Sequence, residues 1–191
     1  GDRAITLTNT SAAAASALTS VDSSGATGGL TFSLANLKDG GAVKLGSGVD
    51  LITVSNLSTA AGFELVQGFE KAAAAAVGTD ASAKAAAITD ADQLALTGAT
   101  GLATDSAAGA AGNTVKAGVL TFAGTGPSTI VDAAAAAAAI TADGQALVFE
   151  YLGNSYVFVE TAAADTLVQI TGVTGVTALG MEAGTNHFFL V

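Results

Sequence analysis

The chain of 191 residues contains no cysteine, no tryptophan, one histidine and one proline. Without cysteine it has no disulfide, no thiolate nucleophile and no cysteine-ligated metal. A single histidine, His187, leaves little material for a histidine zinc site or a Ser-His-Asp triad. The sequence also lacks G-x-S-x-G, P-loop and zincin motifs. We therefore expect a protein that is not an enzyme.

Positive charge is scarce: six Lys and Arg stand against sixteen Asp and Glu, which gives a formal net charge of −10. Such a surface repels phosphate, so we expect no nucleic-acid partner. The longest apolar run, 133–140, covers eight residues. A membrane-spanning helix needs roughly 20, so we expect no membrane insertion. Small cations are the natural ligands of this chain.

Short apolar runs separated by Gly, Ser, Asn and Asp predict strands. These runs are 5–8, 30–34, 43–45, 51–54 and 166–171. Alanine-rich stretches that begin at a capping residue predict helices over 12–18, 81–88 and from Ser128 or Thr129 to Ile140. The sequence predicts a mainly β fold with short Ala-rich helices, as a short-strand sheet or a β-roll or solenoid-like architecture.

The turn dipeptide Gly153-Asn154 lies between two apolar runs, 146–152 and 156–159, and predicts a β-hairpin. The Gly/Ala-rich stretch 99–118 is a candidate junction. It would separate an N-terminal β-rich subdomain, 1–98, from a C-terminal α+β subdomain, 119–191, that contains the hairpin and an apolar tail.

The segment Gly46-Ser47-Gly48-Val49-Asp50-Leu51-Ile52 matches the core of the nonapeptide G-G-x-G-x-D-x-U-x, which winds a β-roll around calcium. Gly46 and Gly48 would let backbone carbonyls turn toward the ion, and Asp50 would supply a hard anionic oxygen. These three residues are the candidate calcium ligands. One copy supplies half a coordination shell, because the ion draws on two successive turns. The alternative is a glycine-rich turn in which Asp50 caps local amides.

Other carboxylates lie close together in the sequence, as Asp90 with Asp92 and Glu64 with Glu70. Such pairs are candidates for acid/base chemistry or metal ligation. The spacing of Asp90 and Asp92 suits a calcium loop, but the later Gly and Glu of an EF-hand are absent. We therefore favour a helix cap and a solvated turn there. For His187, beside aromatics, we expect a packed or exposed side chain rather than a metal ligand.

With one roll-type repeat in an acidic chain rich in Ala, Gly, Thr and Asp, the sequence resembles the RTX group of proteins exported by type I secretion, especially bacterial surface-layer proteins and adhesins. The resemblance covers Val43 to Phe69 and Val119 to Leu179. It implies an extracellular structural module on the bacterial cell surface, with calcium assisting folding and assembly. Its implied partners are further copies in a surface lattice or a cell-surface component, and the type I secretion apparatus.

The C-terminus, 187–191, ends in four apolar residues. It is similar to the hydrophobic tails of several type I secretion signals, although these often carry an acidic residue where this chain has His187. An edge strand that finishes the sheet explains the same residues. The sequence starts at Gly1 without an N-terminal secretory signal, so we read it as an excerpt. Export information would then lie upstream or at the C-terminus.

Two other classes of function stay open. Threonine-bearing strands such as 5–8 can present hydroxyl rows to a carbohydrate or to ice, which an exposed Thr-x-Thr array on adjacent strands would favour. The chain would otherwise be the accessory C-terminal domain of a secreted RTX hydrolase whose catalytic part lies upstream.

Overall fold

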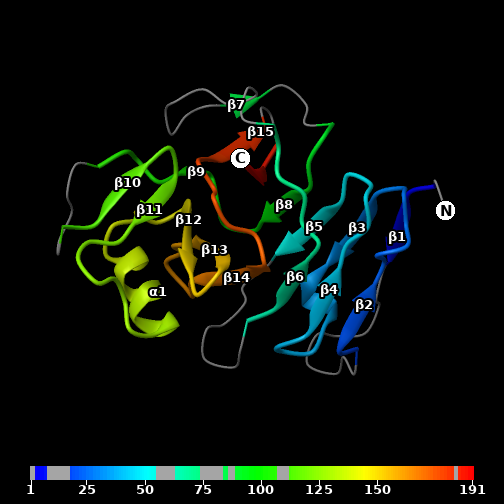
Figure 1. Ribbon diagram of the computed structural model, residues 1–191, viewed down its shortest axis with the longest axis horizontal. Coiled ribbons are helices and arrows are strands. Elements are labelled where there is room, and N and C mark those ends of the chain that lie inside the picture. Colours follow the sequence, from blue (N-terminus) through cyan, green and yellow to red (C-terminus); the bar gives the residue numbers. More distant parts are fainter. Residues whose placement is uncertain are drawn as a thin grey trace.

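Two β-sheets form the body of the protein (Figure 1). The computed structural model describes residues 3–7, 18–54, 63–73, the backbone of 84–85, and residues 89–106, 112–182 and 185–191. The mainly β prediction is confirmed. In the described part of the chain, no helix is long and apolar enough to span a membrane.

The first sheet contains seven strands. In spatial order they are β1 (Ile5–Leu7), β3 (Leu30–Ser33), β5 (Leu51–Val54), β8 (Gln93–Leu96), β16 (His187–Leu190), β15 (Leu179–Glu182) and β7 (Lys84–Ala85). From β1 to β8 neighbouring strands are parallel, whereas β16 is antiparallel to both β8 and β15.

The second sheet contains nine strands. In spatial order they are β10 (Thr114–Lys116), β11 (Val119–Thr121), β12 (Gln145–Tyr151), β13 (Asn154–Val159), β14 (Thr166–Thr171), β6 (Leu65–Gln67), β4 (Ala42–Lys44) and β2 (Ser20–Asp22), with β9 (Gly101–Leu102) beside β12. The strands β14, β6, β4 and β2 are parallel, and β12, β13 and β14 are antiparallel.

The N-terminal strands alternate between the two sheets. The strands β1, β3, β5 and β8 lie in the first sheet, and β2, β4 and β6 lie in the second. Within each sheet neighbouring strands of this set pair in parallel, so the chain winds as a two-layer coil, which is the β-roll or solenoid-like alternative of the fold prediction. We call these seven strands and their turns the coil.

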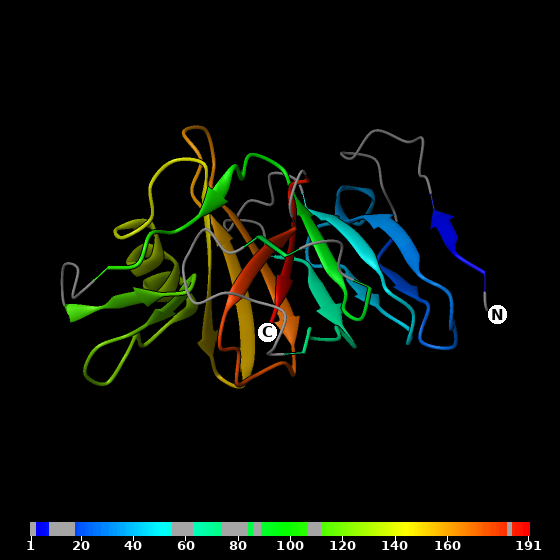
Figure 2. The same cartoon turned by 90° about the horizontal axis from the view of Figure 1, so that it is seen from above.

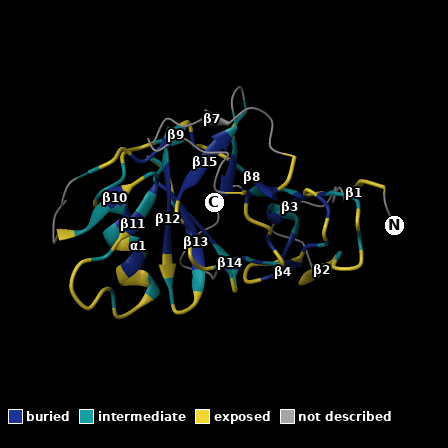
Figure 3. Ribbon diagram, turned by 45° about the horizontal axis from the view of Figure 1, so that its top comes forward, coloured by how far each residue is buried: buried dark blue, intermediate teal, exposed yellow. Residues whose placement is uncertain are grey.

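Buried apolar side chains form the core between the two layers. Figure 3 colours the buried residues of the strands dark blue. Since side chains alternate along a strand, every second residue of a coil strand points inward. In register, the inward row of the first sheet is Phe32, Ile52 and Leu94, and that of the second is Val43, Val66 and Ile170. All six are at most 2% exposed. Strands of three or four residues therefore suffice for a continuous core.

A second apolar cluster lies on the outer face of the C-terminal strands, where the helix α1 (Ile130–Ala138) packs. The buried residues of α1 are Ala133 and Ala137, which belong to the same cluster as Phe149 and Phe158. The helix begins at Thr129, whose hydroxyl accepts from the Asp132 amide while the Asp132 carboxylate accepts from the Thr129 amide. This capping box explains why the predicted start at residue 128 or 129 is correct.

Two other predicted elements differ from the structure. The helix predicted over 81–88 is wrong at Lys84–Ala85, which form strand β7 and pair with β15. Of the helix predicted over 12–18, residues 12–17 lie outside the described residues. The hairpin is confirmed, but its turn residues are Leu152 and Gly153, with φ of 48° and 77°, one position earlier than predicted.

The C-terminal residues form an interior strand rather than the edge strand considered from the sequence. Strand β16 lies between β8 and β15, and Phe188, Phe189 and Leu190 are fully buried. Both sheets cross the predicted 99–118 junction, because β8 pairs with β16 and β6 pairs with β14. The division into separate subdomains, 1–98 and 119–191, stays a prediction.

Candidate metal site in the stacked turns

Three turns of the coil stack on one another where the chain passes from a strand of the second sheet to a strand of the first. The first turn, 23–29, joins β2 to β3, and the second, 45–50, joins β4 to β5. The third is split: 68–70 follow β6, and 91–92 lead into β8. We call these the stacked turns. The candidate ligands Gly46, Gly48 and Asp50 all lie in the second of them.

The glycines of the second turn allow it to touch the first. A Cβ atom on Gly46 would lie 2.1 Å from the Ala26 carbonyl oxygen, and one on Gly48 would lie 2.5 Å from the Gly28 carbonyl carbon. Neither residue is among the glycines with positive φ. Close approach of two backbones, rather than an unusual conformation, therefore requires glycine at these two positions.

The side chain of Asp50 is buried, with 1% of the residue exposed. Its Oδ1 accepts a hydrogen bond of 2.5 Å from the amide of Leu30, one turn earlier. Its buried Oδ2 has no hydrogen-bond partner among the described residues. Burial raises the pKa of Asp50, and hydrogen bonds from the amides of Leu30 and Gly46 oppose that rise. One oxygen therefore caps an amide, as the alternative reading expected, and the other remains a possible cation ligand.

Asp92 occupies the same position in the third turn. It precedes Gln93, which pairs in register with Leu51, just as Asp50 precedes Leu51. The fully buried Asp92 carboxylate accepts hydrogen bonds of 2.8 Å from the amides of Asp50 and Glu70. Burial, together with the neighbouring carboxylates of Asp50 and Glu70, raises the pKa of Asp92 to about 7, although the two amide hydrogen bonds oppose the rise. Asp50 and Asp92 thus tie successive turns together.

The solvated turn or helix cap predicted for Asp92 is wrong, because the residue is fully buried, whereas Asp90 is exposed. A sequence signal existed: Asp92-Gln93-Leu94-Ala95 fits the D-x-U-x half of the repeat. The glycines of the other half are absent before it, and a long insertion separates Glu70 from Ala91.

The stacked turns do not offer a cation a carboxylate cage. Within the described ranges, no three His, Asp or Glu side chains are grouped closely enough to hold a metal. The carbonyl oxygens of Ser23 and Ala26 lie against Gly46. Both carbonyls already accept hydrogen bonds, from the amides of Ala26 and Ser47. Calcium accepts carboxylate oxygens, so the unpaired Asp50 Oδ2 fits its chemistry.

Glu64 is a third buried carboxyl, after Asp50 and Asp92, and its burial was not predicted from the sequence. It precedes β6, is 3% exposed, and its Oε2 has no partner among the described residues. Burial, with a smaller contribution from the charge of Asp39, raises the pKa of Glu64 to about 7. Glu64 and Glu70 lie at opposite ends of β6, so they do not form an acid/base pair.

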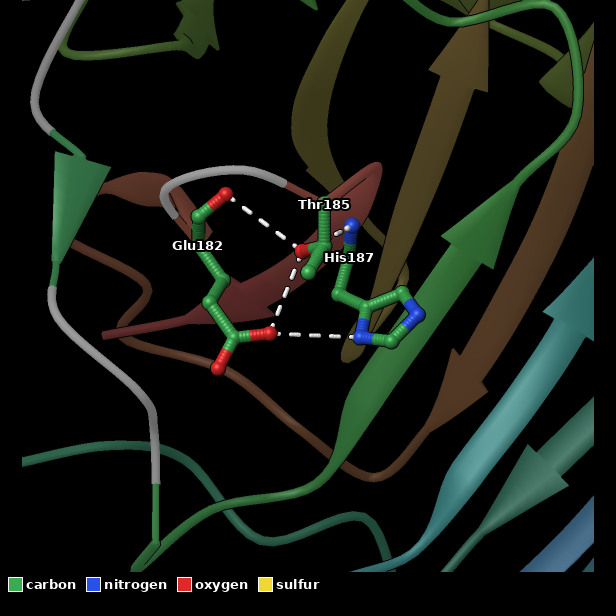
Figure 4. Close-up of polar contacts among 3 residues, drawn as sticks. All are labelled: Glu182, Thr185 and His187. Atoms are coloured by element: carbon green, nitrogen blue, oxygen red, sulfur yellow. Dashed lines mark hydrogen bonds and ion pairs between the residues drawn. The ribbon is translucent and has the colours of Figure 1, made fainter.

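His187 belongs to a polar cluster beside the last hairpin (Figure 4). Glu182 Oε2 lies 3.3 Å from His187 Nδ1 and accepts a hydrogen bond of 3.1 Å from the Thr185 hydroxyl. The Thr185 oxygen accepts from the His187 amide at 3.1 Å. Because the carboxylate stands between hydroxyl and imidazole, this is not the nucleophile–base–acid order of a triad. The cluster instead joins the ends of β15 and β16.

An apolar groove of about 210 Å³ runs beside α1. Its lining includes Phe63, Val131 and Leu167, and Asp165 is the charged residue at its rim. No serine, threonine, histidine or lysine is among the described residues that line it. The groove therefore offers a mainly hydrophobic surface, with Asp165 as the charged side chain among the described residues that line it.

Comparison with known proteins found no relative: no protein-family model, curated protein or solved structure matches the chain. The functional argument therefore depends on the coil and its stacked turns.

Proposed function

We propose that the chain is a non-enzymatic, extracellular structural module of a type I-secreted, RTX-related surface-layer or adhesin-like protein, and that calcium assists its folding and assembly. The observation that supports this proposal best is the repeated use of a buried aspartate in successive stacked turns. Asp50 and Asp92 each precede a strand of the same parallel sheet and each hold an amide of the preceding turn.

Electrostatics gives calcium a role in this arrangement. The negative charge of Glu70 raises the pKa of both Asp50 and Asp92, that of Asp50 also raises the pKa of Asp92, and the whole chain carries a formal charge of −10. A bound divalent cation would remove part of this cost of ionisation. Extracellular calcium sites have dissociation constants of about 10⁻⁴–10⁻³ M, so ordering would follow export from the calcium-poor cytoplasm.

The proposal gives the C-terminal tail two successive roles. The apolar residues of β16 are buried in the folded protein, so a transporter could engage them only before folding. After export the same residues would complete the first sheet beside β8. In this scheme calcium outside the cell favours the folded state and makes export directional.

A calcium titration followed by circular dichroism tests the proposal. Protein prepared in chelator should gain β-sheet signal and a higher melting temperature when about 1 mM calcium is added. Magnesium at the same concentration should give a smaller effect, because it demands octahedral geometry and releases its water reluctantly. An identical spectrum and melting temperature in calcium and in chelator would contradict the calcium part.

The carbohydrate- or ice-binding alternative gains little from the register of the first sheet. Thr6 pairs with Thr31, but the next residue in that row is Leu51. The hydroxyl row of β1 therefore ends after two strands rather than forming a repeated array. The hydrolase-accessory alternative depends on what lies upstream, where a protease or lipase sequence would favour it.

A further inference from the structure

The third stacked turn places a further carboxylate, that of Glu70, near Asp50. The second turn leads into β5 and the third into β8. These two strands lie side by side in the middle of the molecule, between the N-terminal strands and the C-terminal half (Figures 1 and 2). Both turns lie within the described ranges, as does the first turn on the other side of Asp50.

Asp92 holds the backbones of Asp50 and Glu70 next to each other. Its Oδ1 accepts from the Asp50 amide and its Oδ2 accepts from the Glu70 amide, both at 2.8 Å. The Asp92 amide donates in return to the Glu70 carbonyl at 3.1 Å. Glu70 is therefore fixed through both of its backbone groups, whereas both carboxylate oxygens of Asp92 already bind amides. This leaves the side chains of Asp50 and Glu70 as the two candidate ligands.

The negative charge of these carboxylates is not balanced by a nearby cation. The charge of Glu70 raises the pKa of both Asp50 and Asp92. Among the described residues, no Lys or Arg forms an ion pair with any of the three. Lys71 follows Glu70 directly, but its ammonium donates to two carbonyls of the loop before β15, at 3.1 and 2.9 Å. A bound cation would supply the missing positive charge.

Asp50 and Glu70 differ in exposure in a way that suits a cation site. Asp50 is 1% exposed, and its Oδ2 has no hydrogen-bond partner among the described residues. A buried carboxylate oxygen without a partner is costly, and a cation ligand removes that cost. Glu70 is exposed, so its carboxylate can meet an ion that arrives from solvent. The pair offers one fixed ligand and one accessible ligand.

We propose that Glu70 is the second carboxylate ligand of the calcium site, so that the ion binds Asp50 and Glu70 and ties the second stacked turn to the third. The third turn would then supply part of the coordination shell that the single repeat, 46–50, lacks. Calcium suits such a site because it takes about six to eight oxygens in flexible geometry, waters included. This inference rests on the proposed function, which assigns calcium to Asp50.

Isothermal titration with calcium at about pH 8 tests this assignment. Glu70→Gln keeps the backbone hydrogen bonds to Asp92 and should weaken calcium binding by at least ~10-fold, because calcium affinity follows the number of charged ligands. Asp90→Asn, which removes an exposed carboxylate from the same part of the chain, is the matched control and should change affinity by less than ~2-fold.

Glu70→Asp separates direct ligation from attraction at a distance. It keeps the charge but withdraws the carboxylate by one methylene group, so a direct ligand should lose affinity by about 3-fold or more. Attraction at a distance would leave the affinity of Glu70→Asp unchanged, and that result would overturn the assignment.

Thermal unfolding gives a readout that a merely structural role would not produce. In chelator, Glu70→Gln removes repulsion between carboxylates and should raise the melting temperature by roughly 2 °C. In about 1 mM calcium it removes a ligand and should lower the melting temperature relative to the unmodified chain. A shift of the same sign in both conditions would contradict the proposal.

The titrations distinguish this inference from the proposed function. If the unmodified chain binds calcium and Glu70→Gln binds it equally well, Glu70 is not a ligand, although calcium binding through Asp50 stands. If the unmodified chain binds no calcium, both are overturned.

Discussion

Asp50 contributes to stability through the hydrogen bond that its carboxylate accepts from the Leu30 amide. Asp50→Ala leaves the Leu30 amide buried without its acceptor, and we expect the free energy of unfolding to fall by about 1–3 kcal/mol. Asp50→Asn keeps an acceptor oxygen and should lose less. Urea unfolding in chelator measures both, so that calcium does not contribute. Equal stability of Asp50→Ala and the unmodified chain would show that the hydrogen bond makes no net contribution to the free energy of unfolding.

Glu64 makes stability depend on pH. Burial raises its pKa from 4.5 to about 7, so the folded protein holds a proton that the unfolded chain releases. The stabilising contribution is therefore complete below about pH 4.5 and is lost as the pH rises through 7. Glu64→Gln mimics the protonated form at every pH, so its stability should match that of the unmodified chain at pH 4.5 and exceed it at pH 8.

Chemical unfolding at several pH values checks this prediction, with the exposed Asp90→Asn as the control for a lost carboxylate. The buried Asp92 titrates in the same direction and stays present in both proteins, so the difference between them isolates Glu64. A difference in stability between Glu64→Gln and the unmodified chain that is independent of pH would contradict the assignment.

Local sequence identified the turn of Gly46, Gly48 and Asp50 because its residues are adjacent. It could not place Asp92, because that position depends on a strand pairing across more than 40 residues of chain. For Glu64 the sequence offered only a carboxylate next to apolar residues. Its burial follows from where β6 lies between β4 and β14, which local residue type does not specify.

At the scale of elements, the capping box of α1 should contribute measurably. Thr129→Ala removes the acceptor for the Asp132 amide, and we expect a loss of about 1 kcal/mol in the free energy of unfolding. Thr125→Ala, at an exposed position in the preceding loop, should change stability by less than ~0.5 kcal/mol. Thermal unfolding of the two variants compares them directly, and equal effects would rule out a specific role for the cap.

The hairpin turn between β12 and β13 contains an unfavourable residue. Leu152 has φ of 48°, which is unfavourable for a leucine, and its side chain is 81% exposed, so burial of the side chain does not compensate for the backbone strain. Leu152→Asn gives the Asn-Gly pair favoured in such turns and should stabilise the protein by about 0.5–1 kcal/mol. Leu152→Ala is the control, because alanine keeps the strain. A melting temperature that rises equally in both variants would contradict this explanation.

Elements with strong local signals were predictable. The helix from Thr129 has its capping residues in sequence, and the hairpin has two apolar runs around a glycine. The turn was misplaced by one residue because Asn154 is a favoured turn residue, whereas cross-strand pairing sets Leu152 and Gly153 at the turn. The alanines of 81–88 favoured a helix, but pairing with β15 holds Lys84–Ala85 as a strand.

At the scale of the molecule, β16 joins the coil to the C-terminal half. Phe188→Ala would open a cavity between β8 and β15, and we expect a loss of about 3–5 kcal/mol. Because both sheets are continuous, the coil and the C-terminal half should unfold together. Tyrosine fluorescence, from Tyr151 and Tyr156, and far-ultraviolet circular dichroism should therefore give coincident transitions. Separate transitions would indicate independent units.

A β-roll, in which strands alternate between two layers, was one of the two architectures predicted from the sequence, because short apolar runs and glycine-rich turns are typical of a roll. The position of the C-terminal tail was not. His187–Val191 reads as an apolar end, and an edge strand is the simplest placement for the last segment. Its insertion between β8 and β15 depends on pairing partners that the local pattern does not encode.

Isothermal titration with calcium is the most direct test of the central claim, that the stacked turns bind the ion through Asp50. The unmodified chain and Asp39→Asn, which removes an exposed carboxylate from the connection between β3 and β4, outside the stacked turns, should bind with similar affinity. Asp50→Asn keeps the shape and an acceptor oxygen but should lose at least one bound ion. Unchanged stoichiometry and affinity in Asp50→Asn, or no calcium binding by the unmodified chain, would contradict the account.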